Sequence, residues 1–353
     1  MADTLAPTPA TRLFGIEVPV VLGPFGGMSS VRLAAAVSDA GGLGSFGLYG
    51  YPADRIRETA ALLAAATDRP FALNLWLPLD GSDTLRVSAD EFDAYAEALR
   101  PYFDELDLPL PAMPERYLPT FDEQIEAALD ARPAVLSFVF GVPPAHVVDR
   151  AHELGIVVVG AATTVDEAVA LESGGVDAVV ASGMEAGGHR PSFLRAAEES
   201  LVGTFALVPQ VADAVRVPVV AAGGIADGRG LAAALTLGAH AAQVGSAFLA
   251  TEESAAVPAY RDALRNRAGR TVLTRALSGR LARGIPTRIT DAAEPAPFPV
   301  QNWLTGQFRP TAAERGVTDL MSLWAGQSSP LARGDHAADV LQEMVRTAAS
   351  LLP

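Results

Sequence analysis

The chain has 353 residues, of which 50% are hydrophobic, a formal net charge of -15 and no cysteine. That length suits one large α/β barrel with a modest addition. The acidic balance argues against a nucleic-acid partner, since nucleic-acid binders usually carry a basic face, and the lack of cysteine excludes disulfides, thiolate metal sites, iron–sulfur clusters and cysteine nucleophiles.

The N-terminal sequence lacks the basic start and apolar run of a secretory signal. Apolar stretches such as Val217–Ala222 are far shorter than the ~20 residues of a membrane-spanning helix. We therefore expect a cytoplasmic protein with no membrane partner. A secreted protein whose signal has been removed is the alternative, and no feature favours it. The sequence leaves the oligomeric state open, a homo-oligomer included.

Strands and helices alternate along most of the chain, which indicates a parallel sheet. Several runs are continuously apolar, as expected for strands buried on both faces. Eight strands are expected, at Pro19–Gly23, Leu43–Phe46, Phe71–Trp76, Ala134–Phe140, Ile156–Ala161, Ala178–Ser182, Val217–Ala222 and Ala241–Val244. Helices are expected at Val31–Ala40, Pro52–Ala66, Ala145–Leu154, Val165–Ser173 and Gly228–Leu237. The pattern predicts an α/β fold, a (β/α)8 TIM barrel; a doubly wound open sheet is the alternative that strand count alone does not exclude.

Two regions interrupt the regular spacing. Pro78–Arg132, after the third strand, is proline-rich and acidic, with helices predicted at Asp90–Phe103 and Asp122–Ala131. Thr251–Pro353 is too long for one closing helix and ends in a predicted helix near Ala337–Leu351. We expect a cofactor-binding barrel over residues 1–250, with the insertion 78–132 as a lid, and a C-terminal helical extension over 251–353 that packs on the barrel and closes the site.

The insertion carries a candidate apolar face. Phe92, Tyr95, Leu99 and Phe103 recur at roughly helical spacing. This face could pack over the mouth of the barrel and restrict what enters. Packing on the barrel exterior is an equal alternative.

The segment Ala181–Arg190 reads ASGMEAGGHR and follows the sixth predicted strand directly. Its glycines let the backbone approach a flat ligand closely, because no Cβ intrudes. His189, at its end, is of a type that exchanges a proton near neutral pH, so it is the candidate catalytic residue. A loop histidine is more often a solvated or capping residue, and that alternative stays open.

The seventh and eighth strands both end in small residues. Val217–Ala222 runs into Gly223-Gly224, and the eighth strand runs into Gly245-Ser246. The loops after these two strands form the phosphate site of many TIM barrels, where backbone N–H groups hold the anion without a basic side chain. Two ordinary tight turns are the alternative.

Other familiar motifs are missing from the sequence. No G-x-G-x-x-G follows an early strand, and there is no H-E-x-x-H, Walker loop or G-x-S-x-G elbow. The other four histidines are scattered along the chain: His146, His152, His240 and His336. We therefore expect no metal site.

Short motifs spread over the chain resemble those of nitronate monooxygenases, formerly called 2-nitropropane dioxygenases. The matching segments, in order, are GPFGGMSS at Gly23–Ser30, FALNLW at Phe71–Trp76, EAGGH at Glu185–His189, AAGGI at Ala221–Ile225, QVGSAF at Gln243–Phe248, TRALSGRLARG at Thr274–Gly284 and SLWAGQ at Ser322–Gln327. Any one of them is weak evidence, whereas the ordered set is strong.

The resemblance implies an FMN-dependent monooxygenase on a TIM barrel. His189 matches the family's catalytic histidine. The positions that the resemblance assigns to FMN are Pro24, Phe25 and Gly26 beside the flavin, Asn74 at its polar edge, Ser182, Gly183 and Gly187 in the sixth loop, Gly223, Gly224, Gln243, Val244, Gly245 and Ser246 around the phosphate, and Gln327 from the C-terminal region.

Three positions depart from the family pattern. Phe25 stands where methionine is common, Ser182 replaces a frequent glutamine, and Pro191 follows His-Arg where glycine is usual. Proline stiffens the loop that carries His189. We still expect FMN binding with these changes, whereas they leave the identity of the substrate open.

The implied reaction oxidises alkyl nitronates or nitroalkanes with O2 to carbonyl compounds and nitrite, with FMN supplying the redox chemistry. A neutral nitroalkane must first lose a proton, for which neutral His189 could be the base; a nitronate needs no base. Protonated His189 could instead hold the anionic nitronate. The EAGGH loop also resembles flavin-dependent NAD(P)H:quinone reductases and enoyl-reductases, and a flavin-binding scaffold without turnover is the non-enzyme alternative.

Overall fold

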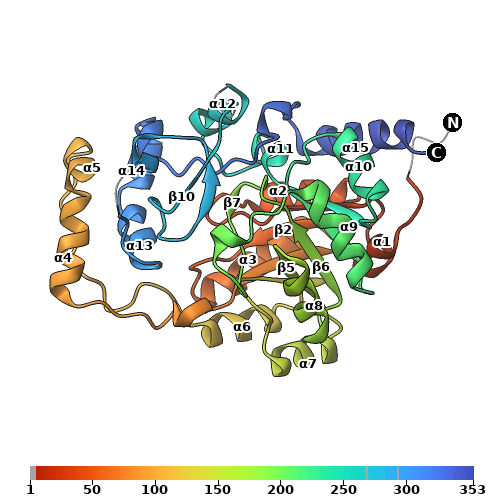
Figure 1. The fold of residues 1–353 in the computed structure, drawn as a ribbon, viewed down its shortest axis with the longest axis horizontal. Coiled ribbons are helices and arrows are strands. Elements are labelled where there is room, and N and C mark those ends of the chain that lie inside the picture. The colour runs from red at the N-terminus through yellow and green to blue at the C-terminus, as the bar shows by residue number, and fades with distance from the viewer. Residues whose placement is uncertain (1–4, 267–268, 292–293) are drawn as a thin grey trace.

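A computed structural model describes residues 5–266, 269–291 and 294–353 and shows a closed eight-stranded parallel barrel (Figure 1). The strand order is β1-β9-β8-β6-β5-β4-β3-β2, and a parallel bridge between Val21 and Leu43 joins the first and last strands. The strands are β1 (Val20–Leu22), β2 (Gly44–Gly47), β3 (Phe71–Trp76), β4 (Val135–Val139), β5 (Val157–Ala162), β6 (Ala178–Ser182), β8 (Val219–Ala222) and β9 (Ala241–Val244). The prediction of a TIM barrel is confirmed, and the open sheet is excluded.

Small side chains fill the inside of the barrel. Ala72, Ala161, Ala222 and Ala241 belong to one inner cluster, together with valines from most of the strands. Phe14, from α1 (Pro9–Phe14), joins the same cluster. This short helix was not expected from the sequence, and its aromatic ring adds the bulk that the alanines of the barrel lack.

Eight helices, one after each strand, surround the barrel. They are α2 (Val31–Asp39), α3 (Ala53–Ala66), α6 (Phe121–Asp130), α7 (Ala145–Glu153), α8 (Val165–Ser173), α9 (Thr204–Ala214), α10 (Gly228–Thr236) and α15 (Ala337–Leu351). The last of them, α15, packs against α10 and α2 and so takes the place of the helix that follows the eighth strand. Helix α9 was missed in the sequence because Pro209 lies inside it, and proline normally breaks a helix.

The insertion after β3 packs against the C-terminal region. Its helices are α4 (Ala89–Ala98) and α5 (Arg100–Glu105), and they stand beside α13 (Val300–Gly306) and α14 (Arg309–Glu314) in Figure 1. Phe92 contacts Trp303 at a ring-centroid distance of 5.9 Å, and Phe103 meets Phe308 edge-on at 5.2 Å. The apolar face read from the sequence therefore packs on the C-terminal extension. The single helix predicted at Asp90–Phe103 is wrong, because it breaks at Leu99, just before Pro101.

A small antiparallel sheet lies outside the barrel. It consists of β7 (Gly188–His189), β11 (Ala282–Gly284) and β10 (Val272–Thr274). His189 pairs with Ala282 in this sheet. The loop after β6 is thereby fixed to the C-terminal extension by backbone hydrogen bonds, a pairing that the sequence pattern did not predict.

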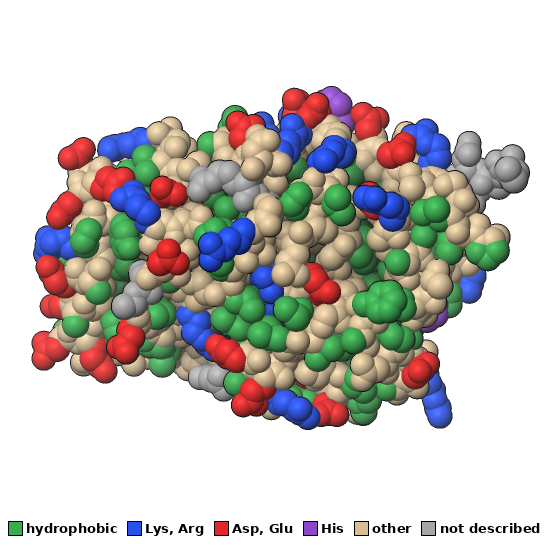
Figure 2. Space-filling model, turned by 45° about the horizontal axis from the view of Figure 1, so that its top comes forward, with side chains coloured by type: hydrophobic (Ala, Val, Ile, Leu, Met, Phe, Trp, Pro, Cys, Tyr) green, Lys and Arg blue, Asp and Glu red, His purple; other side chains and the backbone are tan. Residues whose placement is uncertain are grey.

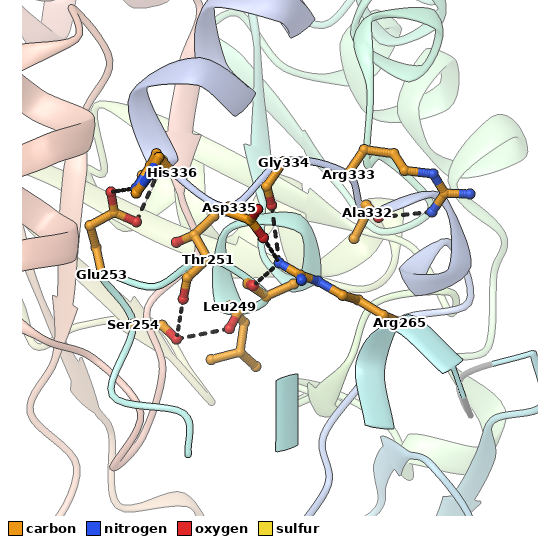
Figure 3. A network of polar contacts seen from close by, with 12 residues as sticks. Leu249, Thr251, Glu253, Ser254, Arg265, Ala332, Arg333, Gly334, Asp335 and His336 are labelled. Carbon is orange, nitrogen blue, oxygen red and sulfur yellow. Dashed lines mark hydrogen bonds and ion pairs between the residues drawn. The ribbon is translucent and has the colours of Figure 1, made fainter. Parts of the chain in front are cut away.

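A polar network ties the loop after β9 to the start of α15 (Figure 3). Arg265, in α12 (Pro258–Asn266), donates to Ala250 O at 2.9 Å and to Asp335 Oδ1 at 2.7 Å. Glu253 accepts from the backbone N–H of Ala337 at 3.1 Å and so caps α15. These contacts hold together the two ends of the segment that connects β9 with α15.

The surface is unevenly charged. Acidic side chains gather at the end of the molecule formed by α4 and α5, on the left of Figure 2. Within the described part of the chain, no helix combines the length and apolarity needed to cross a membrane.

Candidate active site

The carboxyl ends of the strands bring the predicted residues to one face of the barrel. Asn74, near the end of β3, is buried, and its Nδ2 donates to Ser137 Oγ at 3.0 Å on the neighbouring strand. Gln243 is half-buried and lies two residues beyond Ala241, which faces the barrel interior. Since side chains alternate along a strand, Gln243 also points into the barrel.

Glycine turns at β8 and β9 form a cradle of free backbone donors. Gly223 and Gly224 have φ angles of 99° and 72°, which favour glycine. Within the part of the chain that the structure describes, the N–H groups of Gly223, Gly224, Gly245 and Ser246 donate to no backbone or side-chain acceptor. Such groups are suited to a phosphate. The hydroxyl of Ser246 accepts from Gly326 N at 2.9 Å, which attaches the C-terminal segment to this cradle.

Other predicted positions fulfil packing roles. A Cβ on Gly183 would lie 1.9 Å from Thr204 Oγ1, and one on Gly187 would lie 2.6 Å from the backbone of Ala325. Val244 is fully buried in the outer core, so only its backbone is near the cradle. These residues explain the shape of the loops, and their contact with a cofactor stays a prediction.

The remaining predicted positions lie in the loop after β1, at the end of β6 and in the C-terminal extension. Pro24 and Phe25 are half-buried and Gly26 is exposed in the loop after β1, and Ser182 is buried at the end of β6. A Cβ on Gly245 would lie 3.6 Å from the Phe25 ring, so that ring borders the cradle. Gln327 is exposed, and its backbone N–H donates to Glu185 O at 2.9 Å.

Arg190 holds the loop after β6 from inside. It is 2% exposed, and its guanidinium donates to Gly183 O at 2.6 Å, Ser182 O at 2.9 Å and Ser200 O at 3.4 Å. Burial lowers the pKa of Arg190 to about 10, so the group remains charged at neutral pH. Pro191, next to it, is buried as well. The loop that carries His189 is therefore rigid.

Replacing Arg190 with methionine should destabilise the protein by about 2–4 kcal/mol, because buried carbonyl oxygens lose their donors. The free energy of unfolding in urea measures this. Arg195→Met is the matched control, since Arg195 is exposed and forms an ion pair with Asp166 at the surface. A surface pair contributes ~0–1 kcal/mol. Equal losses in the two variants would contradict the structural role of Arg190.

His189 lies between two indole rings. Its ring centroid is 4.8 Å from that of Trp76 and 5.3 Å from that of Trp324, and its Nε2 is 2.8 Å from Ser278 Oγ. Burial, and then the positive charges of Arg280 and Arg309, lower its pKa to about 3. Its side chain is therefore a neutral imidazole at physiological pH, able to accept a proton. Protonated His189 as the group that holds an anion is opposed by the same charges.

A small cavity opens beside Trp76, the residue whose ring contacts this histidine. Tyr49, Trp76, Phe298 and Arg280 line it, together with residues from both ends of the insertion. The guanidinium of Arg280 lies between two aromatic rings, 4.0 Å from the Phe298 centroid and 4.4 Å from the Phe140 centroid. The cavity thus has aromatic walls and a cationic side.

Several of these residues were not singled out in the sequence, although most lie in the quoted motifs. Trp76 ends FALNLW, Ser278 and Arg280 lie in TRALSGRLARG, and Trp324 lies in SLWAGQ. Tyr49 follows the second strand, so the rule that site residues come directly after strands could have found it. No local signal marked Arg309.

Comparison with known proteins identifies the family to which the chain is similar. The chain matches the nitronate monooxygenase family over residues 8–347. It is 42% identical to the nitronate monooxygenase of Pseudomonas aeruginosa, over 95% of this chain and 97% of that protein. It is 36% identical to a probable nitronate monooxygenase of Staphylococcus saprophyticus, over 98% of each.

Solved structures give a similar result. A nitroalkane oxidase from Streptomyces ansochromogenes superposes with a TM-score of 0.88 at 37% identity, over 97% of this chain and 98% of that chain. FabK from Thermotoga maritima superposes less closely, with a TM-score of 0.77 at 29% identity, over 98% and 97%.

Proposed function

The chain belongs to the nitronate monooxygenase family, and on that premise we propose that it binds FMN and oxidises alkyl nitronates or nitroalkanes with O2 to carbonyl compounds and nitrite. The observation that carries the proposal is the position of His189. It is half-buried between Trp76 and Trp324, at the end of the loop that packs against the glycine cradle. A neutral proton acceptor beside an aromatic cavity suits a small, largely apolar carbon acid.

The residues present fit FMN. The cradle at Gly223, Gly224, Gly245 and Ser246 offers backbone donors of the kind that bind a phosphate. Gly224 has a left-handed backbone conformation, which strains any residue with a side chain. A side chain at this position would also project from the exposed side of the turn. Asn74, Ser182 and Gln243 would reach the isoalloxazine from the barrel mouth. When bound, FMN would supply the redox chemistry that none of these side chains can perform.

The chain's own residues position and deprotonate the substrate. His189 accepts the proton next to the nitro group of a neutral nitroalkane, with Ser278 orienting its Nε2. The positive charges of Arg280 and Arg309 then favour the anion that forms, since both act on the same site. A pre-formed nitronate skips the first step and uses only the second.

We also propose that residues 1–250 form the FMN-binding barrel, while the extension 251–353 closes the active site and contributes α15 to the barrel wall. The insertion would restrict access through its ends. Leu118 and Phe121 line the cavity, whereas α4 and α5 pack on the extension. The lid would therefore be formed by the two ends of the insertion, one after Pro78 and the other around Leu118 and Phe121.

Replacing Leu118 with alanine should change the size preference of the enzyme. Shortening a side chain at the cavity removes contact with small substrates and admits larger ones, and one or two carbons in an apolar pocket shift discrimination by ~10-fold. The ratio of kcat/KM for a six-carbon nitronate to that for ethyl nitronate measures the change. Phe103→Leu is the control: it should lower stability and leave the ratio unaltered. A ratio that Leu118→Ala does not move would contradict the lid.

The second candidate function is a flavin-dependent reductase that uses NAD(P)H, and the resemblance to FabK is the observation in its favour. Anaerobic mixing of the yellow protein with ethyl nitronate or with NADPH separates the two. Rapid bleaching of the flavin by the nitronate alone supports the proposed function. Rapid bleaching by NADPH alone, or a colourless protein that takes up no FMN, contradicts it.

A further inference from the structure

Tyr49 lies at the mouth of the barrel, among the residues that line the cavity. It follows β2 and is half-buried, and its ring is 4.3 Å from that of Trp76. A Cβ on Gly26 would lie 3.7 Å from its Cβ, so Tyr49 borders the loop after β1. Trp76 thus contacts both Tyr49 and His189, and the tyrosine is within the same aromatic enclosure as the candidate base.

A directed chain of hydrogen bonds ends at the Tyr49 hydroxyl. Arg309 Nη2 donates to Asn302 Oδ1 at 3.0 Å, and Asn302 Nδ2 donates to the Tyr49 hydroxyl at 2.8 Å. A guanidinium has donors only, so the atom of Asn302 that it contacts must be the carbonyl oxygen. The amide orientation is therefore fixed by chemistry, and the NH2 group must face Tyr49.

The hydroxyl of Tyr49 is left with one unused hydrogen. Its oxygen accepts from Asn302, and among the residues that the structure describes no acceptor takes its proton. A phenol O–H lies near the ring plane, so with Asn302 on one side the hydrogen points to the other. Tyr49 is one of the residues that line the small cavity beside Trp76, so a ligand bound there could accept this hydrogen.

The series of hydrogen bonds that ends at Tyr49 begins at a positively charged group. Arg309 stands at its far end, where its Nε is buried without a hydrogen-bond partner. Burial also raises the pKa of Tyr49, which keeps the phenol protonated and able to donate. A cation behind two aligned dipoles strengthens the terminal O–H donor, and the favoured acceptor is a negatively charged oxygen.

We propose that Tyr49 donates a hydrogen bond to a negatively charged oxygen of the substrate, and that Asn302 and Arg309 are positioning residues that set the direction of that bond. This rests on the proposed function, since a nitronate carries its charge on such oxygens. Tyr49 would hold the oxygen end of the substrate while His189 faces the carbon that loses the proton.

The first test replaces Tyr49 with phenylalanine in the FMN-loaded protein. Propionate is the probe, because its planar carboxylate resembles ethyl nitronate and it does not react. Its Kd, followed by the change in flavin absorbance, should rise about 10- to 100-fold, the range for a lost hydrogen bond to a charged group. The kcat/KM for ethyl nitronate should fall by a similar factor. Tyr51→Phe is the control, since the Tyr51 hydroxyl contacts the exposed Arg55.

The second test reverses the hydrogen-bond chain. Asn302→Asp keeps the acceptor for Arg309 but removes the donor to Tyr49, so the phenol must give its hydrogen to the new carboxylate. Propionate binding should weaken as much as in Tyr49→Phe. Adding Asn302→Asp to Tyr49→Phe should cost less than adding it to the wild type. The difference isolates the effect that passes through the hydroxyl, because charge repulsion is present in both backgrounds.

The outcomes separate this inference from the proposed function. If the wild type oxidises nitronates and Tyr49→Phe leaves both Kd and kcat/KM within about two-fold, the role of Tyr49 is overturned. Additive effects of Tyr49→Phe and Asn302→Asp would overturn the role of Asn302. If the wild type binds propionate with the expected dependence on Tyr49 but oxidises no nitronate, the anion site stands and the proposed reaction fails.

Discussion

The His189→Ala variant should lose about 10²- to 10⁴-fold in kcat/KM for neutral nitroalkanes, while nitronates lose less than about ten-fold. General-base catalysis contributes a factor of this size, and only the neutral substrate needs its proton removed. The low pKa of His189, about 3, leaves the imidazole neutral and free to accept that proton. Steady-state oxygen consumption with nitroethane and with ethyl nitronate measures both losses.

The control for this prediction is His152→Ala, which removes a surface histidine that pairs with Asp177. It should leave both substrates unchanged. The pH profile gives a second check. Because the pKa is lowered, His189 gains its proton only near pH 3, so kcat/KM for nitronate should show no histidine ionisation between about pH 5 and 8. Equal losses on both substrates would contradict the role of His189 as a base, whereas an ionisation near pH 6.5 that disappears in His189→Ala would contradict its lowered pKa.

The Gly224→Val variant should retain FMN about 10- to 100-fold less tightly. A side chain at the exposed side of this turn would displace the phosphate from the N–H groups of the cradle, and each hydrogen bond to a charged group contributes about 1.5–3 kcal/mol. The FMN content after dialysis and the Kd from fluorescence titration measure the effect.

Gly155→Val separates this effect from backbone strain. Gly155 has a φ of 73°, close to the 72° of Gly224, and like Gly224 it has room for a Cβ. Both variants should therefore lose similar stability in the FMN-free form, about 1–2 kcal/mol. Only Gly224→Val should lose the cofactor. If both variants keep FMN equally well, the phosphate lies elsewhere.

The positions of the candidate site residues were largely predictable because they follow from a rule of the fold. In a parallel barrel all carboxyl strand ends meet at one face, so a residue directly after a strand reaches that face whatever its separation in the sequence. His189 and Gly224 were found in this way, whereas Asn74, inside β3, was assigned from the resemblance to the family. The neutrality of His189 was not predictable, because it depends on Trp76, Trp324 and two arginines that come from other segments.

The sequence by itself determined the eight strands and their alternation with helices, since several of the strands are continuous apolar runs. The tertiary structure decided that they close into a barrel and do not form a doubly wound open sheet. The sequence also determined where the glycine turns lie. Only the tertiary structure decided which way α4 and α5 face, that β7 joins β11, and that Arg309 reaches Tyr49 through Asn302. Local patterns indicate which residues are buried. The partner that buries or orients each of them depends on contacts between different segments of the chain, which no local pattern encodes.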